Sequence, residues 1–297
     1  MQSRFHWVLA RATYPGLLVG SLGLAWGLLE LGLSPSATAV VAFLVALGFT
    51  ALLERVYPHD AAARIERGDL AYLGLVAVVQ GLAKAGGQLV AVAAGLALTA
   101  SLGPRPWPGG WPLAAQVALA VLTADLVKYG LHRLAHERPW WWRFHAEHHA
   151  PASVHAFNGV RLHPVNALWN LGVDAVMPLV LGLEGRAVVL AAVVRGTVAV
   201  LQHANMPLVL GPLDWIFSTP TLHRWHHSTK LEEANSNYGS TLIVWDLLFR
   251  TRFDVPGAAP AAFGLADGAP HPRRFSAQLA WPWCSRAPAA RRARCLA

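Results

Sequence analysis

Three short histidine-rich segments contain the residues of this chain that are best suited to chemistry. They are His-Arg-Leu-Ala-His at 132–136, His-Ala-Glu-His-His at 145–149 and His-Arg-Trp-His-His at 223–227. Side chains three or four residues apart lie on the same face of a helix, so each segment presents its imidazoles to one side. Neutral imidazole is a ligand for iron, zinc, copper or nickel. The predicted metal ligands are His132, His136, His145, His148, His149, His223, His226 and His227.

The composition indicates that these segments belong to an integral membrane protein. Of the 297 residues, 55% are hydrophobic and only 13% are charged, whereas about a quarter are charged in a typical soluble domain. A membrane span needs about 20 mainly apolar residues. Long apolar runs occur at 14–33, 37–53, 70–101, 113–131, 165–183 and 186–202. The first run is longer than the core of a cleavable signal, so we expect the protein to retain it.

The positions of the basic residues predict how the chain is oriented. The 70–101 run could be one bent span or two short spans separated near Lys84. With one span, nearly every Lys and Arg falls on the same face as the histidine segments, as the positive-inside rule requires. We therefore expect one span and a cytoplasmic histidine-rich region. Because the placement of charge explains the net charge of +8, no nucleic-acid partner is expected.

Residues 164–203 are expected to form a transmembrane hairpin with a tight turn at 182–185. Each leg is long enough to cross one bilayer core, at about 1.5 Å per residue. The second leg returns the chain to the level of the histidine segments at His203, which becomes a ninth candidate ligand. His163 arrives at the same level as a weaker tenth candidate.

Two charged residues fall inside this hairpin at similar depth. Asp174 lies in the first leg and Arg195 in the second. Because charges buried in a bilayer are normally paired, we expect an ion pair between the two legs.

Three regions follow from these patterns. Residues 1–112 provide N-terminal membrane helices, 113–253 form a di-metal region that includes the hairpin, and 254–297 form a basic, Pro- and Ala-rich tail. Thr219-Pro220 predicts the start of the helix that carries the third histidine segment. Cys284 and Cys295 lack the spacing of a disulfide framework or a zinc site and are expected to be ordinary thiols. The predicted fold class is an all-α, polytopic membrane protein with a cytoplasmic histidine-rich di-metal cap.

The motifs from about 117 to 253 resemble the fatty acid hydroxylase/sterol desaturase superfamily of membrane di-iron oxygenases. The HxxxH, HxxHH and second HxxHH segments occur with Arg143-Phe144-His145, Leu162-His163-Pro164, Asn237-Tyr238-Gly239 and Trp245-Asp246. The resemblance implies that the eight histidines of the three segments bind the metals. It also implies that His203 is the family's additional histidine, although Ala199 stands where some members have another.

Other polar residues are expected to support the ligands. Asp125 lies two turns before His132 and could either accept a hydrogen bond from an imidazole or pair with Lys128. His163 is expected to act in the same supporting way rather than as a ligand. Asn158 and Asp246 are weaker candidates for this role. Tryptophans 140–142 are interpreted as an interfacial anchor, with a substrate entrance as the second interpretation.

The resemblance implies an O2-dependent hydroxylation or desaturation of a lipid, such as a fatty acyl chain or a sterol. The expected cofactor is a pair of iron ions, although zinc could occupy the same ligands. The chain has no iron–sulfur, P-loop or dinucleotide-binding motif, so electrons are expected from a separate ferredoxin, or from a cytochrome b5-like protein with its reductase. The alternatives are a zinc-dependent lipid hydrolase and a haem-binding membrane cytochrome. A bacterial inner membrane is the preferred location, with the endoplasmic reticulum as the alternative.

Overall fold

The computed structural model describes residues 4–63, 68–79, 101, 107–183, 185–266, 271–272 and 274–284. Within these ranges the regular elements are helices, accompanied by two isolated β-bridges, so the predicted all-α fold is confirmed. In chain order the α-helices are α1 (Arg4–Glu30), α2 (Pro35–Val56), a helix at Gly68–Val79, α4 (Leu113–Glu137), α5 (Pro139–His149), α6 (Pro164–Leu181), α7 (Gly185–Leu201), α8 (Pro220–His226), α9 (Leu231–Ala234), α10 (Val244–Leu248) and α11 (Phe275–Cys284). Short 3-10 helices cover Ala156–Val160 and Gly211–Trp215.

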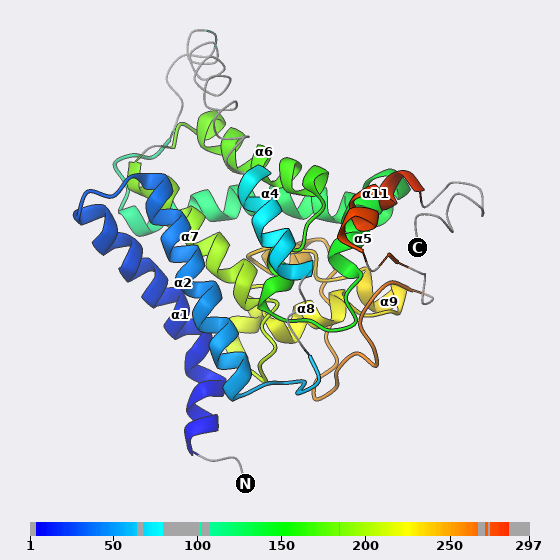
Figure 1. Ribbon diagram of the computed structural model, residues 1–297. Coiled ribbons are helices and arrows are strands. Elements are labelled where there is room, and N and C mark those ends of the chain that lie inside the picture. The colour runs from blue at the N-terminus through cyan, green and yellow to red at the C-terminus, as the bar shows by residue number, and fades with distance from the viewer. Residues whose placement is uncertain are drawn as a thin grey trace.

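Helix α7 lies at the centre of the helical layer that it forms with α1, α2 and α4 (Figure 1). Each of the four hydrophobic clusters in the core contains residues from this helix. Its sequence is mostly apolar, apart from Arg186 at its start, Arg195 and Thr197, and a helix that is apolar on nearly all sides is normally buried. The protein itself therefore encloses most of α7.

Helices α6 and α7 form the hairpin that was predicted from the sequence. Gly182 has a φ of 71° and Gly185 a φ of 58° at the turn, a backbone conformation that glycine adopts without steric cost. The two legs bring Asn166 near the start of α6 and Ala199 near the end of α7 to the same side of the molecule as the histidines. The hairpin thus positions the site, while its passage through a membrane stays a prediction.

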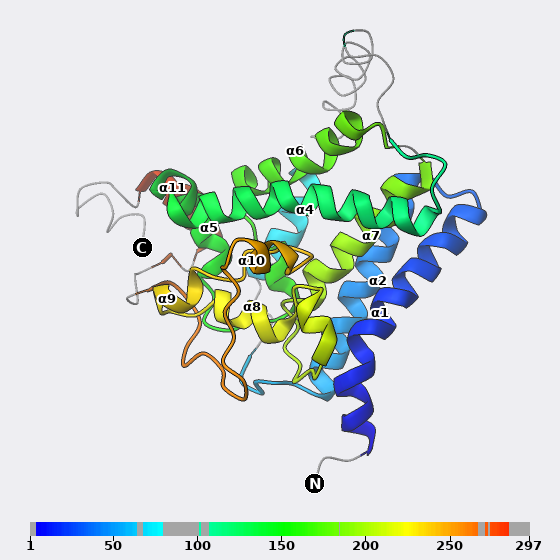
Figure 2. The ribbon, with the colours of Figure 1, turned by 180° about the vertical axis from the view of Figure 1, so that it is seen from behind.

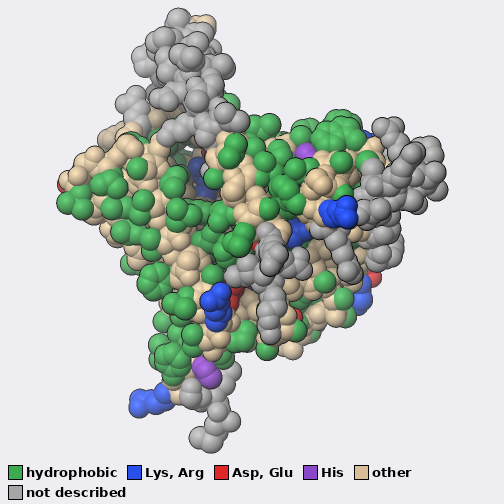
Figure 3. Space-filling view, in the orientation of Figure 1, with side chains coloured by type: hydrophobic (Ala, Val, Ile, Leu, Met, Phe, Trp, Pro, Cys, Tyr) green, Lys and Arg blue, Asp and Glu red, His purple; other side chains and the backbone are tan. Residues whose placement is uncertain are grey.

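Helices α1, α2 and α4 are each long and apolar enough to cross a membrane. Large hydrophobic side chains remain exposed along them and along α6, for example Val19, Leu44, Phe49 and Val176. Figure 3 shows hydrophobic side chains covering the face over α1 and α2. These features belong to an integral membrane protein. The second half of the 70–101 run lies outside the described residues, and with it the choice between one span and two.

The histidine-bearing elements gather at one end of the helical layer. Figure 2 shows α8 and α10 below the C-terminal half of α4, with α5 beside them. Helix α8 begins at Pro220 with Thr219 as its N-cap, as predicted, although the Thr219 hydroxyl bonds to Asp214 rather than to the helix backbone. The segment expected to be a loose tail contains α11, which packs against α5. Cys284 at the end of α11 is disulfide-bonded, so the expectation of a free thiol there was wrong.

Candidate metal centre

The nine predicted ligand histidines lie together and divide into two groups. Within each group, the nitrogen atoms that could bind a metal all lie within 4.8 Å of one another. One group contains His132, His136, His145, His149 and His226, and the other contains His148, His203, His223 and His227. The structure is compatible with a two-metal site in which neighbouring helices contribute to both ions.

Helical spacing explains how the histidines are shared between the groups. Each of the three segments contributes one pair of histidines four residues apart, and both members of a pair belong to the same group. The middle histidine of each HxxHH segment belongs to the other group. His148 joins the group of four although His145 and His149 belong to the group of five, and His226 joins the group of five although His223 and His227 belong to the group of four. Each HxxHH segment therefore bridges the two groups.

The ring nitrogens face each other in an arrangement that suits a cation between them. The Nε2 atoms of His132 and His226 are 2.9 Å apart, yet the Nδ1 atoms of both rings lie 2.7 Å from backbone carbonyl oxygens, to which they must donate. The same holds for His148 and His203, with Nε2 atoms 3.2 Å apart and Nδ1 atoms on carbonyl oxygens. In neutral rings of this tautomer, both Nε2 atoms carry lone pairs, which repel each other without an ion.

The distances agree with nitrogen ligands on one ion. With metal–nitrogen bonds of about 2.1 Å, two ligands at a right angle have nitrogens about 3.0 Å apart, and opposite ligands about 4.2 Å. The observed Nε2 separations are 2.9–3.2 Å for the contacting pairs. Haem would require its two histidine ligands on opposite sides of the iron, so these pairs argue against the cytochrome alternative.

Burial keeps the imidazoles of α5 and α8 neutral. Removal from water lowers the pKa of His145, His148 and His149, and the neighbouring rings lower it further. The pKa values of His223 and His226 fall for the same two reasons, and so does that of His227. A neutral ring has a free lone pair, which is the form that binds a metal.

Residues outside the two groups orient the rings. Asn166 of α6 accepts a hydrogen bond of 2.8 Å from Nδ1 of His145 through its side-chain oxygen. Asn235 does the same for His136 at 3.3 Å. Such contacts fix the tautomer and direction of a ligand ring. Sequence reasoning missed both residues; the signal available for Asn166 was a polar side chain at the start of an apolar run.

Asp246 supports His132 through the backbone. Its carboxylate accepts hydrogen bonds from the backbone nitrogens of Tyr238 and Gly239 at 2.8 and 2.7 Å. The carbonyl oxygen of Tyr238 then accepts the Nδ1 proton of His132. A Cβ at Gly239 would lie only 2.9 Å from the carboxylate, so glycine permits this turn. Asp246 thus influences His132 indirectly, by holding the Tyr238 backbone that contacts the ring.

The other predicted supporting residues do not contact the ligand rings. Asp125 accepts a hydrogen bond from the backbone nitrogen of Leu242. Asn158 bonds to the backbone of His155 and Ser153, holding the loop between α5 and α6. His163 faces α11 and bonds to the carbonyl oxygen of Leu279. A direct role for these three side chains at the metals stays a prediction.

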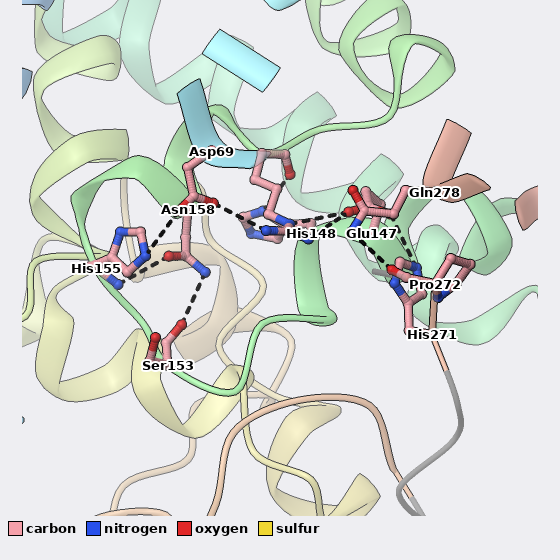
Figure 4. A network of polar contacts seen from close by, with 10 residues as sticks. Asp69, Glu147, His148, Ser153, His155, Asn158, His271, Pro272 and Gln278 are labelled. Carbon is pink, nitrogen blue, oxygen red and sulfur yellow. Dashed lines mark hydrogen bonds and ion pairs between the residues drawn. The ribbon is translucent and has the colours of Figure 1, made fainter. Parts of the chain in front are cut away.

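A buried ionic network lies directly behind His148. The guanidinium of Arg161 contacts Glu147 and Asp69 at 3.1 Å each, and these three side chains are at most 5% exposed. His271 contacts the other oxygen of Glu147 at 3.1 Å, which ties the C-terminal segment to α5. Figure 4 shows this network beside His148, whose Nδ1 lies 3.3 Å from the Arg161 carbonyl oxygen. Glu147 therefore points away from the metal groups.

The tryptophan segment and a cavity complete the surroundings. The ring of Trp142 lies 5.1 Å from that of His136 and 5.4 Å from that of His149, whereas Trp140 is exposed. A cavity of about 330 Å³ has histidines from both groups in its wall and extends between α4, α6 and α7. It provides space for a substrate next to the nitrogen ligands.

Residues 117–251 match the family model described as fatty acid hydroxylase. Over 251 residues, the chain is 34% identical to ornithine lipid hydroxylase OlsE from Rhizobium tropici, an alignment covering 82% of this chain and 75% of the relative. The chain therefore belongs to the fatty acid hydroxylase family. It is a membrane lipid hydroxylase, an oxidoreductase with a histidine-rich site suited to two metals, as the sequence predicted.

Alkylglycerol monooxygenases are similar to about half of this chain. The chain is 28% identical to the alkylglycerol monooxygenases of Xenopus tropicalis and Homo sapiens, over 54% and 49% of its length. These alignments cover only 34% and 32% of the two relatives. No solved structure matches the chain.

Proposed function

We propose that this protein hydroxylates a membrane lipid with an amino-acid headgroup, such as an ornithine lipid, at a di-iron centre held by the nine histidines. The paired Nε2 atoms carry the proposal, because their lone pairs face each other at 2.9–3.2 Å while the Nδ1 atoms donate elsewhere. The relative with the longest alignment described above is an ornithine lipid hydroxylase, which supports this substrate class. Hydroxylation is preferred over desaturation because that relative and the alkylglycerol monooxygenases insert oxygen, as their names state.

Bound iron would supply the cleavage of dioxygen with two electrons and two protons, one oxygen atom entering a C–H bond and the other leaving as water. The protein's own groups orient the ligand rings and hold the substrate. His132 and His148 are fixed by backbone carbonyls, and His145 by Asn166, so that their Nε2 atoms converge. The cavity aligns the substrate beside these rings and keeps bulk water from the reacting carbon.

Electrons have to come from a second protein in this proposal, because the sequence contains no iron–sulfur or dinucleotide-binding motif. A ferredoxin, or a cytochrome b5-like protein with its reductase, would serve. The basic residues that predict a cytoplasmic histidine face also suit an acidic electron donor. The bacterial relative supports a bacterial inner membrane as the location.

The test combines metal analysis with lipid analysis. Protein purified in mild detergent without added metal is expected to contain about two irons per chain, from the two groups of ligands. With reductant and ¹⁸O2, a lipid extract containing ornithine lipids is expected to gain one ¹⁸O atom per product molecule. Turnover without oxygen by a zinc-loaded protein would overturn the proposal in favour of the lipid hydrolase.

A further inference from the structure

We propose that Lys128, Asp174 and Arg195 form a subsite that holds the ionic headgroup of the lipid substrate. The carbon that is oxidised then belongs to the headgroup or to the bonds beside it, not to a distant part of an acyl chain. This inference rests on the proposed function and specifies how the same cavity recognises its substrate.

The three residues form a mixed-charge cluster on three different helices. Nζ of Lys128 on α4 lies 2.9 and 3.0 Å from the two carboxylate oxygens of Asp174 on α6. The Nη2 atom of Arg195 on α7 lies 3.1 Å from the first of these oxygens. The predicted ion pair between the hairpin legs is therefore present, and Lys128 joins it. Sequence reasoning placed Lys128 only as a possible partner of Asp125.

All three side chains line the cavity that reaches the histidines, and their charges do not cancel. Two cations face one carboxylate, and Asp174 is the only acidic residue among the described residues of the cavity wall. Asp125, less than one turn before Lys128, is buried off the wall and bonds to the backbone of Leu242. Among the residues that line the cavity, positive charges thus exceed negative charges by one, while the buried Asp125 interacts electrostatically with Lys128 from outside the wall.

An anionic group in the cavity would satisfy this excess. Charges removed from water are stable only when they are paired and hydrogen-bonded. Nε of Arg195 is buried and has no hydrogen-bond partner among the described residues. Asp174 keeps 35% of its side-chain surface accessible, which leaves room for a cation next to it. The cluster therefore fits a zwitterion, with its anion on Lys128 and Arg195 and its ammonium near Asp174.

The order of residues along α7 places this cluster between the histidines and an apolar end. Ala199, whose carbonyl oxygen accepts the Nδ1 proton of His203, lies one turn after Arg195, or about 6 Å along the helix. In the other direction, the wall continues with Ala192 and Val188. Charge lies near the metal ligands and apolar surface lies beyond it.

The other helices around the cavity repeat this order. Lys128 lies one turn before the ligand His132 on α4, again about 6 Å along the helix. Phe43 of α2 and Val76 of the helix at 68–79 add apolar surface to the wall. A lipid whose ionic group lies at the cluster would extend its chains along the apolar walls and its headgroup toward the histidines.

This arrangement selects among lipids by charge. An acylated ornithine keeps a carboxylate and an ammonium group, which match the two signs of the cluster. A lipid with a neutral glycerol headgroup offers neither charge and would leave the excess cation unpaired. The proposal therefore commits to a zwitterionic lipid as the substrate.

The experiment compares two lipids with two proteins. An ornithine lipid and its carboxyl methyl ester are each added to purified, iron-loaded wild type and Lys128→Met, which retains the neutral Asp174–Arg195 pair. Losing a hydrogen bond to a charged group is expected to raise KM for the free carboxylate about tenfold or more, with little change in kcat. KM for the ester is expected to change less than about twofold, because the ester carries no charge for Lys128 to bind.

Controls separate recognition from folding. Lys128→Arg keeps the cation and is expected to restore most of the preference for the carboxylate. Arg186 lies on the same helix as Arg195, is exposed, and pairs with Glu30 of α1. The variant Arg186→Met, which removes this cation, is expected to behave as wild type. Binding is followed independently as the rise in Tm that each lipid causes.

Tandem mass spectrometry of the product locates the new oxygen. Oxygen in the headgroup fragment, together with a carboxylate preference that Lys128→Met abolishes, supports the subsite. Oxygen in the acyl chain, or an equal effect of Lys128→Met on both lipids, overturns it while leaving a lipid hydroxylase. Selective binding of the carboxylate lipid without any oxygen insertion would instead overturn the proposed function and leave the subsite supported.

Discussion

Replacing Asn166 by leucine tests whether the two groups of histidines bind separate ions. The side-chain oxygen of Asn166 accepts the Nδ1 proton of His145, at 2.8 Å, and Asn166 is only 2% exposed. Leucine has a similar volume but no acceptor. The substitution therefore leaves a buried N–H without a partner and frees the ring to choose the other tautomer, in which Nε2 carries the proton and cannot bind a metal.

The structure sets the size and the place of the effect. A buried donor left unsatisfied costs about 1–3 kcal/mol, which corresponds to about 5- to 150-fold in metal affinity. Loss of such ring-orienting contacts typically lowers metal affinity about 10- to 100-fold. His145 belongs to the group of five histidines, and in the described part of the chain Asn166 makes no hydrogen bond to a residue of the group of four. The affinity of the protein for one of the two ions should therefore fall, while its affinity for the other stays unchanged.

Equilibrium dialysis against a graded chelator, followed by metal analysis, measures this difference. Wild type should release both ions over one range of chelator, whereas Asn166→Leu should release one ion at about 10- to 100-fold lower concentration and retain the other. Asn170→Leu is the matched control, since Asn170 lies one turn further along α6 and lines the same cavity. Release of both ions together from Asn166→Leu would refute the assignment of the two groups to separate ions. Unchanged affinity in Asn166→Leu, or an equal loss in Asn170→Leu, would refute the role of the Asn166–His145 hydrogen bond.

Three further predictions concern stability. Arg161→Met should lower the free energy of unfolding by about 3–5 kcal/mol in denaturant titrations, because it leaves Glu147 and Asp69 buried and unpaired; a loss below about 1 kcal/mol would contradict the buried network. Gly159→Ala should lower Tm and weaken metal binding, since its Cβ would lie 2.7 Å from the Ala199 carbonyl oxygen that orients a ligand ring. The metal-free protein should lose stability as the pH falls below about 6.5, because the unfolded state takes up protons there while burial keeps the folded imidazoles of α5 and α8 neutral. Each ring that stays neutral in the folded state should lower the free energy of unfolding by about 1.4 kcal/mol at pH 5.5. A Tm that is constant from pH 8 to 5.5 would exclude this linkage.

The disulfide at Cys284 and the position of His271 show how much the C-terminal segment contributes. From the sequence, residues 254–297 are expected only to be a basic, Pro- and Ala-rich tail, because such a composition carries no periodic signal. In the structure, His271 contacts Glu147 between two ligand positions, and α11 packs on α5. These contacts join residues more than 100 positions apart, so no local pattern could have revealed them.

Local spacing determined which residues could bind metal. Histidines at i and i+4 share a helix face whatever surrounds them, so the ligand pairs of α4, α5 and α8 follow from the 3.6-residue period alone. The start of α8 after Thr219, the α6–α7 hairpin and the Asp174–Arg195 pair also follow from local rules of capping, turns and depth. The ligand pairs depend on positions within one helical turn, whereas the hairpin and its ion pair depend on a turn between two consecutive helices.

Only the tertiary structure decided how the ligands divide and what surrounds them. His148 shares a helix face with His145 and His149 but joins the group formed with His203 and α8, because the choice depends on which rings lie opposite. The polar cluster around Lys128 likewise requires α4 to pack against both legs of the hairpin. Sequence periodicity gives the direction of a side chain on its own helix, whereas its partner is selected by the packing of helices that are distant along the chain.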